Sequence, residues 1–131
     1  MKNYSRQREA ILQVLKEMKT HPTASAVYEK VRELLPNISL GTVYRNLSAL
    51  RDSGQILSLS VGDGFEHFDG DSSPHIHLHC QHCKKILDLV MDGDPAADRA
   101  AKAGFVTQTS IYIVYGSCKD CANQETKKEI I

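Results

Sequence analysis

The chain has 131 residues, enough for one medium-sized domain or two small ones, and its hydrophobic content of 41% is ordinary for a globular protein. No apolar run is long enough to span a bilayer and no apolar signal-peptide core opens the sequence, so we expect a cytoplasmic protein and exclude a membrane-embedded one. The net charge of zero divides unevenly: residues 1–61 carry nine Lys and Arg against five Asp and Glu, and residues 62–131 carry seven against eleven.

Three amphipathic helices are predicted in the basic half, because apolar residues recur there at i, i+3, i+4 and i+7. The predicted core stripes are Ile11, Val14, Leu15 and Met18; Val27, Val31, Leu34 and Leu35; and Leu40, Val43, Leu47 and Leu50. The predicted N-caps are Ser5, Thr23 and Ser39, and Gly54 stands where a C-terminal glycine belongs.

The third of these helices, residues 39–52, has a polar outer face. Arg45 points away from the core stripe, with Thr42 and Ser48 beside it and Tyr44 at the border. Such a face can enter a major groove and contact both bases and phosphates. The alternative is a helix whose polar face is merely solvated.

A β-hairpin follows, because the alternating segments 56–61 and 65–68 flank Gly62-Asp63-Gly64. Three helices and a hairpin are the parts of a winged helix-turn-helix, so we predict a DNA-binding domain over residues 1–68. A basic half joined to an acidic half suits this reading, although a chance scatter of surface charge explains the imbalance equally well.

Four cysteines form two C-x-x-C pairs in the acidic half. Two such knuckles can present four thiolates to one tetrahedral zinc ion, so we predict a structural zinc site at Cys80, Cys83, Cys118 and Cys121. The alternative is a redox dithiol, which predicts one catalytic pair near the start of a helix.

A row of alternating histidines precedes the first knuckle. In a strand, His75 and His77 lie on one face and Cys80 on the other, which implies a second metal site with Asp69 and Asp88 as nearby acidic candidates. A solvated or hydrogen-bonded histidine pair is the alternative. Three other histidines are predicted to be ordinary surface residues: His67, His79 and His82.

The rest of the second half is predicted to be a small α/β domain. It contains a strand over 86–90, a helix over 95–103, a long alternating strand over 105–115 and a fraying polar tail over 123–131. The expected organisation is a DNA-binding domain, a hinge at 69–74 and a dimerisation and metal-binding domain at 75–131. The expected fold class is therefore α+β.

Motifs across nearly the whole chain resemble the ferric uptake regulator (Fur) family, and within it the peroxide-sensing PerR branch. The residues that carry this resemblance are His21-Pro22-Thr23-Ala24, Ser39 to Arg45, Phe68-Asp69, His75-x-His77-x-x-Cys80-x-x-Cys83 and Tyr115-Gly116-x-Cys118-x-x-Cys121. The resemblance implies a metal-dependent repressor that binds a palindromic DNA operator as a homodimer, has no organic substrate and is not an enzyme.

The resemblance also implies specific ligands. It puts the structural zinc on the four cysteines and a regulatory ion on His21, Asp69, His75, His77 and Asp88. Three imidazoles and two carboxylates suit Fe²⁺ or Mn²⁺. The PerR branch further implies that peroxide oxidises a ligand histidine, here His21 or His75, and so releases DNA.

Some residues depart from the family pattern. Pro74, Ile76 and Ser110 stand where many iron-uptake members have an additional metal site, and the leading helix of many members is missing. Asp88 favours the peroxide branch, whereas Arg45 favours an iron- or manganese-responsive uptake regulator. Two other classes remain as alternatives: a metalloenzyme that uses the His/Asp cluster, and a zinc scaffold that binds protein partners without DNA.

Overall fold

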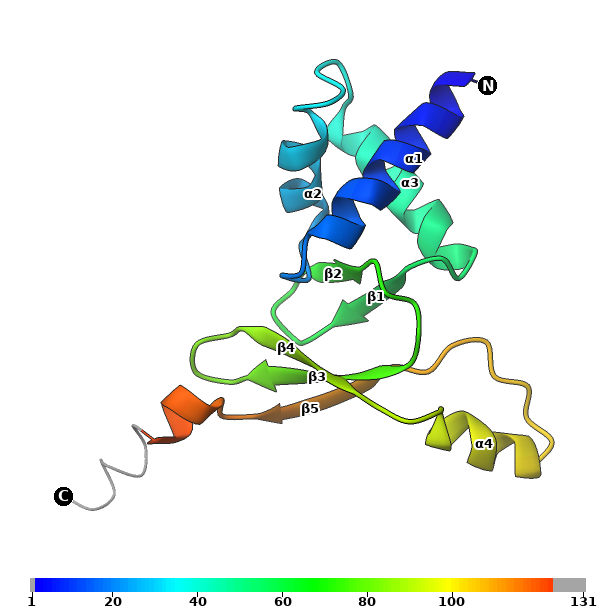
Figure 1. Ribbon diagram of the computed structural model, residues 1–131, viewed down its shortest axis with the longest axis vertical. Helices are drawn as coiled ribbons and strands as arrows, with labels where there is room; N and C mark the ends of the chain where they lie inside the picture. Colours follow the sequence, from blue (N-terminus) through cyan, green and yellow to red (C-terminus); the bar gives the residue numbers. More distant parts are fainter. Residues whose placement is uncertain (1, 124–131) are drawn as a thin grey trace. The chain divides into compact units, whose positions relative to one another are not determined.

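The computed structural model describes the backbone of residues 2–123 and the side chains of residues 6–123 (Figure 1). The predicted polar tail therefore lies outside the described residues beyond Asn123. The chain divides into two compact units, Met1–Ser73 and Pro74–Ile131, and together they contain both helices and sheets, as an α+β protein does. None of the helices in the described part of the chain is long and apolar enough to cross a membrane.

Three helices build the core of the first unit: α1 (Lys2–Glu17), α2 (Ala24–Val31) and α3 (Leu40–Asp52). The fully buried apolar side chains from these helices are Ile11, Leu15, Val27, Val31, Val43 and Leu47. Two members of the predicted stripes are wrong, because Leu34 is 58% exposed beyond the end of α2 and Leu40 is 43% exposed in the first turn of α3. The early end of α2 at Val31 moves Leu34 into a turn, where helical spacing no longer applies.

Two of the three predicted N-caps are confirmed. Thr23 accepts a hydrogen bond from the backbone N–H of Ala26 at 3.3 Å, and Ser39 accepts one from the N–H of Thr42 at 3.1 Å. The predicted Ser5 cap is wrong because α1 already begins at Lys2. Gly54 follows α3 with φ of +80°, the left-handed conformation that glycine adopts without steric cost after a helix.

A two-stranded antiparallel hairpin completes the first unit. Strand β1 (Leu57–Ser60) pairs with β2 (Glu66–Asp69) so that Leu57 lies opposite Asp69 and Ser60 opposite Glu66. Phe68 on β2 is fully buried in the helical core, so the hairpin is packed against the helices by its own strand.

The second unit contains a three-stranded sheet in the order β4-β3-β5. The central strand β3 (His75–Cys80) pairs antiparallel with β4 (Ile86–Val90) and parallel with β5 (Tyr112–Gly116). Helix α4 (Pro95–Lys102) lies in the connection between the two outer strands (Figure 1). Its N-cap is Asp94, which accepts hydrogen bonds from the N–H of Ala97 and from the hydroxyl of Tyr112.

The predicted long strand over residues 105–115 is wrong, because β5 begins only at Tyr112. The pairing register explains this difference. Tyr112 lies opposite Ile76, so residues before Ile111 run past the start of β3, where Pro74 has no N–H to donate. A segment without a partner strand does not form a ladder, and Phe105 and Val106 are 64% and 87% exposed.

The two faces of this sheet differ in chemistry. The pairing register aligns His77 with Asp88 and places Ile76 and Leu78 on the opposite face. That opposite face, which we call the apolar sheet face, consists of Ile76, Leu78, Leu87, Leu89, Tyr112 and Val114. The histidine face lies on the other side of the same three strands.

Candidate metal centres and nucleic-acid interface

The four cysteines meet at one end of the sheet in the second unit. Cys80 ends β3 and lies opposite Gly116 of β5, so the strand pairing brings both knuckles together. The four Sγ atoms all lie within 4.8 Å of one another, and the Sγ atoms of Cys83 and Cys118 are 3.8 Å apart. Thiolates bound at 2.3 Å to one tetrahedral zinc ion are about 3.8 Å apart, whereas a disulfide needs about 2.05 Å. The cluster therefore fits a zinc ion.

The electrostatics of the cluster favour thiolates as ligands. Backbone N–H groups of Cys118 and Cys83 donate to the Sγ of Cys80 at 3.3 and 3.5 Å, and they lower the pKa of Cys80 to about 5. The side-chain hydrogen bond with Cys118, together with burial, raises the pKa of Cys121 to about 12. A bound divalent cation would favour the charged form of each sulfur, so that all four would bind zinc as thiolates.

The predicted regulatory ligands fall into two groups, one in each unit. In the first unit, Nε2 of His21 lies 3.4 Å from Oδ2 of Asp69, the last residue of β2. Two atoms bound to the same ion at about 2.1 Å lie about 3.0 to 3.6 Å apart, depending on the bond angle. The His21–Asp69 pair therefore has the spacing of two ligands of one ion.

The second group lies on the histidine face of the sheet. Oδ1 of Asp88 is 3.6 Å from Nε2 of His75 and 3.8 Å from Nε2 of His77. The two imidazole rings are 4.3 Å apart between centroids, as expected for residues i and i+2 of one strand. Asp88 is placed there because it is the antiparallel partner of His77, a register that the sequence alone did not provide. This group offers a metal ion one carboxylate and two imidazoles.

The backbone of His21 is unusual. Its φ of +55° lies in the left-handed region, which costs a residue other than glycine on the order of 1–3 kcal/mol. Two hydrogen bonds hold the segment in place: Nδ1 of His67 binds the carbonyl of His21 at 2.8 Å, and the N–H of Phe68 donates to the carbonyl of Pro22 at 2.9 Å. Strand β2 therefore fixes the loop that carries His21.

Two of the three histidines predicted as ordinary surface residues are not. His79 is only 5% exposed, and its ring forms a T-shaped pair with the Tyr115 ring, with centroids 5.7 Å apart. His67 makes hydrogen bonds with both ring nitrogens, the second one joining Nε2 to Oδ2 of Asp63 at 2.6 Å. His82 is exposed, as predicted. The alternation of β3 already predicts that His79 shares a face with His75 and His77; what the sequence did not show is that the strand is buried as far along as His79.

The outer face of α3 carries a small cluster of polar groups around Arg45. A guanidinium nitrogen of Arg45 donates to the hydroxyl oxygen of Thr42 at 3.0 Å, and the hydroxyl of Ser39 donates to the same oxygen at 2.9 Å. Arg45 is exposed and Thr42 is partly exposed. The guanidinium is thus oriented by its own helix and remains accessible to a polyanion.

Tyr44 lies next to this cluster, but its hydroxyl points to the hairpin. It donates to Oε1 of Glu66 at 3.4 Å, while Arg51 donates to Oε2 of the same carboxylate at 2.5 Å and Ser58 also donates to it. Burial acts to raise the pKa of Glu66, but the hydrogen bonds from Ser58 and Arg51 outweigh it and leave that pKa below its ordinary value. Glu66 therefore links α3 to both strands of the hairpin.

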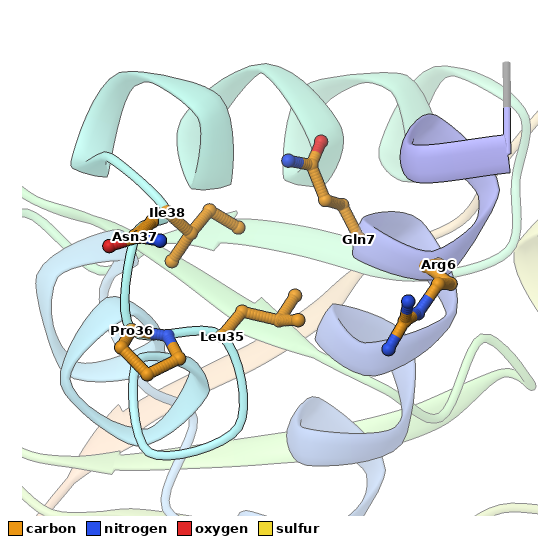
Figure 2. A pocket seen from close by; sticks show the side chains of 6 residues that line it. All are labelled: Arg6, Gln7, Leu35, Pro36, Asn37 and Ile38. Carbon is orange, nitrogen blue, oxygen red and sulfur yellow. The ribbon is translucent and has the colours of Figure 1, made fainter.

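The first unit also has a surface cavity of about 240 Å³ between α1 and the loop that precedes α3 (Figure 2). Its lining residues are Arg6, Gln7, Leu35, Pro36, Asn37 and Ile38. Arg6 is the one charged residue in this lining, so the cavity contains neither a nucleophile with a base nor a group of metal ligands.

Comparisons with known proteins agree with these features. The model of the "Ferric uptake regulator family" matches residues 2–115. The "Peroxide operon regulator" of Bacillus subtilis is 36% identical over 121 residues, which are 91% of this chain and 83% of that protein. The "Peroxide-responsive repressor PerR" of Staphylococcus aureus is 35% identical over 120 residues, covering 90% of this chain and 81% of that protein.

A solved structure is also similar. The peroxide stress regulator of Campylobacter jejuni superposes with a TM-score of 0.76 at 28% identity, and the match covers 91% of each chain. The four-cysteine cluster and the two His/Asp groups supply this chain with donors for zinc and for a harder divalent ion. The chain therefore belongs to the ferric uptake regulator family of transcriptional regulators, and within it resembles the peroxide-responsive repressors.

Proposed function

We propose that this protein is a metal-dependent transcriptional repressor that binds operator DNA as a homodimer and senses peroxide by oxidation of a ligand histidine. The observation that carries the proposal is the set of two ligand groups, His21 with Asp69 and His75 with His77 and Asp88, in a chain similar to peroxide-responsive repressors. The protein would act in the cytoplasm.

The first unit is proposed to be a winged helix-turn-helix. In this interpretation α3 is the recognition helix, the β1–β2 hairpin is the wing, and the DNA contacts come from Thr42, Tyr44 and Arg45. The accessible guanidinium of Arg45 and the helical N-cap at Ser39 support this assignment. The Glu66 contacts of Tyr44 leave the edge and face of its ring, rather than its hydroxyl, for bases.

The second unit is proposed to be the dimerisation domain, held together by zinc on Cys80, Cys83, Cys118 and Cys121. Its apolar side chains support this role. Among the described residues, fifteen hydrophobic side chains are buried, and Cys80 is the single one that belongs to this unit. Leu87, Leu89 and Val114 on the apolar sheet face are 41%, 48% and 53% exposed. A second copy that covers this face would provide the missing core and would match a palindromic operator.

The regulatory ion is proposed to take all five ligands: His21, Asp69, His75, His77 and Asp88. The first unit offers two of them and the second unit offers three, so neither unit alone has the complete set. A ligand set divided in this way makes metal binding favour one arrangement of the two units. In this way an ion that binds none of the residues of α3 would control DNA binding.

Ferrous iron supplies the one-electron chemistry that converts hydrogen peroxide into an oxidant beside its ligands. In our proposal one oxygen atom of peroxide is inserted at a ring C–H of His21 or His75, and the hydrogen of that C–H stays on the oxidised ring. The other oxygen leaves as water with the two peroxide hydrogens. The oxidised ring is a poorer ligand, so the two groups separate and DNA is released. Manganese does not readily support this chemistry, and the four cysteines take no part in it.

The second candidate function is an iron- or manganese-responsive uptake regulator of the same family. Arg45 favours it, because peroxide sensors often have asparagine at this position of the recognition helix. The same ligands would then report metal supply through occupancy alone, without oxidation.

The deciding experiment starts from anaerobically purified protein loaded with Fe²⁺ or Mn²⁺. We expect both forms to bind DNA from the promoter of the protein's own gene, and the metal-free form to bind weakly. Peroxide should abolish binding by the Fe²⁺ form alone, and peptide mass mapping should find one added oxygen on a peptide that contains His21 or His75. Intact histidines with unimpaired DNA binding would leave the uptake regulator as the better answer.

A further inference from the structure

His67 lies at the centre of a chain of contacts inside the first unit. Its Nδ1 binds the carbonyl oxygen of His21 at 2.8 Å, and its Nε2 binds Oδ2 of Asp63 at 2.6 Å. The two partners, a backbone carbonyl and a carboxylate, hold the ring from both sides. The side chain of His67 is only 14% exposed, which keeps water from replacing these partners freely.

At the His21 end of this series of contacts, the backbone conformation is unfavourable. His21 has a φ of +55° in the connection between α1 and α2, a conformation that a residue with a Cβ seldom adopts unless its surroundings enforce it. The ring of His67 and the N–H of Phe68 bind the consecutive carbonyls of His21 and Pro22. These two bonds fix the peptide groups on the C-terminal side of His21, whose imidazole faces Asp69.

The other end of this series of contacts lies in the loop of the hairpin. Asp63 is fixed there because its Oδ1 accepts a hydrogen bond from the N–H of Phe65 at 3.0 Å. Its second carboxylate oxygen remains directed at His67. One carboxylate therefore connects the fold of the hairpin loop to the ring that holds His21.

We propose that His67 is a positioning residue that ties the tip of the hairpin to the metal ligand His21. It binds no metal itself. It keeps the His21 loop in the conformation that places the imidazole beside Asp69, and Asp63 keeps His67 in place. The inference rests on the proposed regulatory site, and it adds that the wing and the metal are coupled within the first unit. Because such coupling is reciprocal, metal binding would stabilise the tip and a displaced tip would weaken metal binding.

The test measures Mn²⁺ affinity of the full-length, zinc-loaded protein in three variants. His67→Leu removes both hydrogen bonds, and Asp63→Asn weakens the bond to the tip from an exposed position that leaves the core intact. Asp92→Asn, an exposed change in the second unit, is the matched control. Loss of a residue that orients a metal ligand typically lowers affinity by about 10- to 100-fold, so we expect at least a tenfold loss for His67→Leu. A smaller loss is expected for Asp63→Asn and none for Asp92→Asn.

The thermal midpoint of the metal-free protein separates positioning from a merely structural role. A structural role would lower this midpoint and leave the Mn²⁺ affinity of the folded protein unchanged, which would overturn the proposal. Unchanged affinity in Asp63→Asn alone would overturn the link to the hairpin tip. His21→Ala distinguishes failure of the regulatory site from failure of the His67 proposal. If His21→Ala leaves Mn²⁺ affinity intact, the proposed regulatory site itself is wrong. If His21→Ala weakens binding and His67→Leu does not, only the proposed role of His67 is wrong.

Discussion

Arg45 is the cation of the polar cluster on the outer face of α3. Arg45 is exposed, it is oriented by Thr42, and among the polar side chains on this face it is the strongest donor for a base edge or a phosphate. The DNA contact proposed for Arg45 can therefore be tested without changing a residue of either proposed metal centre.

Arg45→Ala should weaken operator binding by about 1–3 kcal/mol, because one bidentate base contact is worth that amount. The measurement is a titration of labelled operator at fixed salt and saturating Mn²⁺, with metal content determined in parallel. Arg99→Ala on α4 removes the same charge from the second unit and should have little effect. Equal affinity of the Arg45 variant and the native protein would remove α3 from the proposed interface.

The zinc cluster makes a second prediction for single residues. Cys118→Ser should abolish stoichiometric zinc and unfold the second unit, because the free energy of zinc binding, on the order of 10 kcal/mol, is also folding free energy. Metal analysis and circular dichroism measure the two effects, and Thr109→Ala, at an exposed position outside the knuckles, is the control. A native protein that is fully folded without zinc would contradict the structural role.

Sites whose residues follow a recognisable local spacing were the ones that could be predicted from the sequence. The spacing of the cysteines was sufficient to identify their cluster, since two C-x-x-C knuckles allow few arrangements. His21 could be identified as a ligand only through the family resemblance, because nothing local links it to Asp69, which is far along the chain in β2. The contact between His67 and His21 was missed for the same reason, because its carbonyl partner is 46 positions away.

Between elements, Glu66 connects the hairpin to α3. This carboxylate on β2 receives hydrogen bonds from Tyr44 and Arg51 on α3 and from Ser58 on β1. The pKa of Glu66 is lower in the folded chain than its ordinary value. Ionised Glu66 therefore stabilises the fold fully at pH values above that ordinary pKa. The stabilisation is lost as the pH falls through the lowered pKa.

Glu66→Gln should therefore lower the thermal midpoint of the protein at neutral pH by several degrees, the effect of about 1 kcal/mol in a unit of this size. The difference between native and variant midpoints should shrink as the pH falls below 4.5, the ordinary pKa of this glutamate, since protonation removes the same charge from the native protein. Thermal melts from about pH 3 to about pH 7 measure this difference. A pH-independent difference would show that the charge of Glu66 is not what stabilises the hairpin.

The element boundaries followed the same distinction between local and distant causes. Thr23 and Ser39 were predicted as caps because the capping bond spans three residues. The start of β5 was not predictable from its alternating pattern, since it depends on where β3 begins and on Pro74. Apolar alternation describes a residue's suitability for a strand, whereas the pairing partner decides whether a strand forms.

At the scale of the whole molecule, the apolar sheet face predicts the oligomeric state. Leu89→Glu puts a charge on the β4 side of this face and should convert the proposed dimer to a monomer with at least a tenfold loss of operator affinity, because burying an unpaired carboxylate is strongly unfavourable. Sedimentation velocity measures the mass, and Glu33→Gln in the first unit is the control. A dimer of unchanged stability in the Leu89 variant would place the interface elsewhere.

Few apolar side chains are buried in the described part of the second unit, which has a further consequence if the unit is the dimerisation domain, as proposed. If a second copy completes that core, folding of the unit is bimolecular, and its midpoint rises with protein concentration by mass action. The number of repressor molecules in a cell would then act twice, once on operator occupancy and once on the fraction of chains that survive proteolysis. Repression would then rise more steeply with expression level than binding at one site predicts. When growth dilutes the protein, the concentration of folded dimer would fall faster than the total concentration of chains.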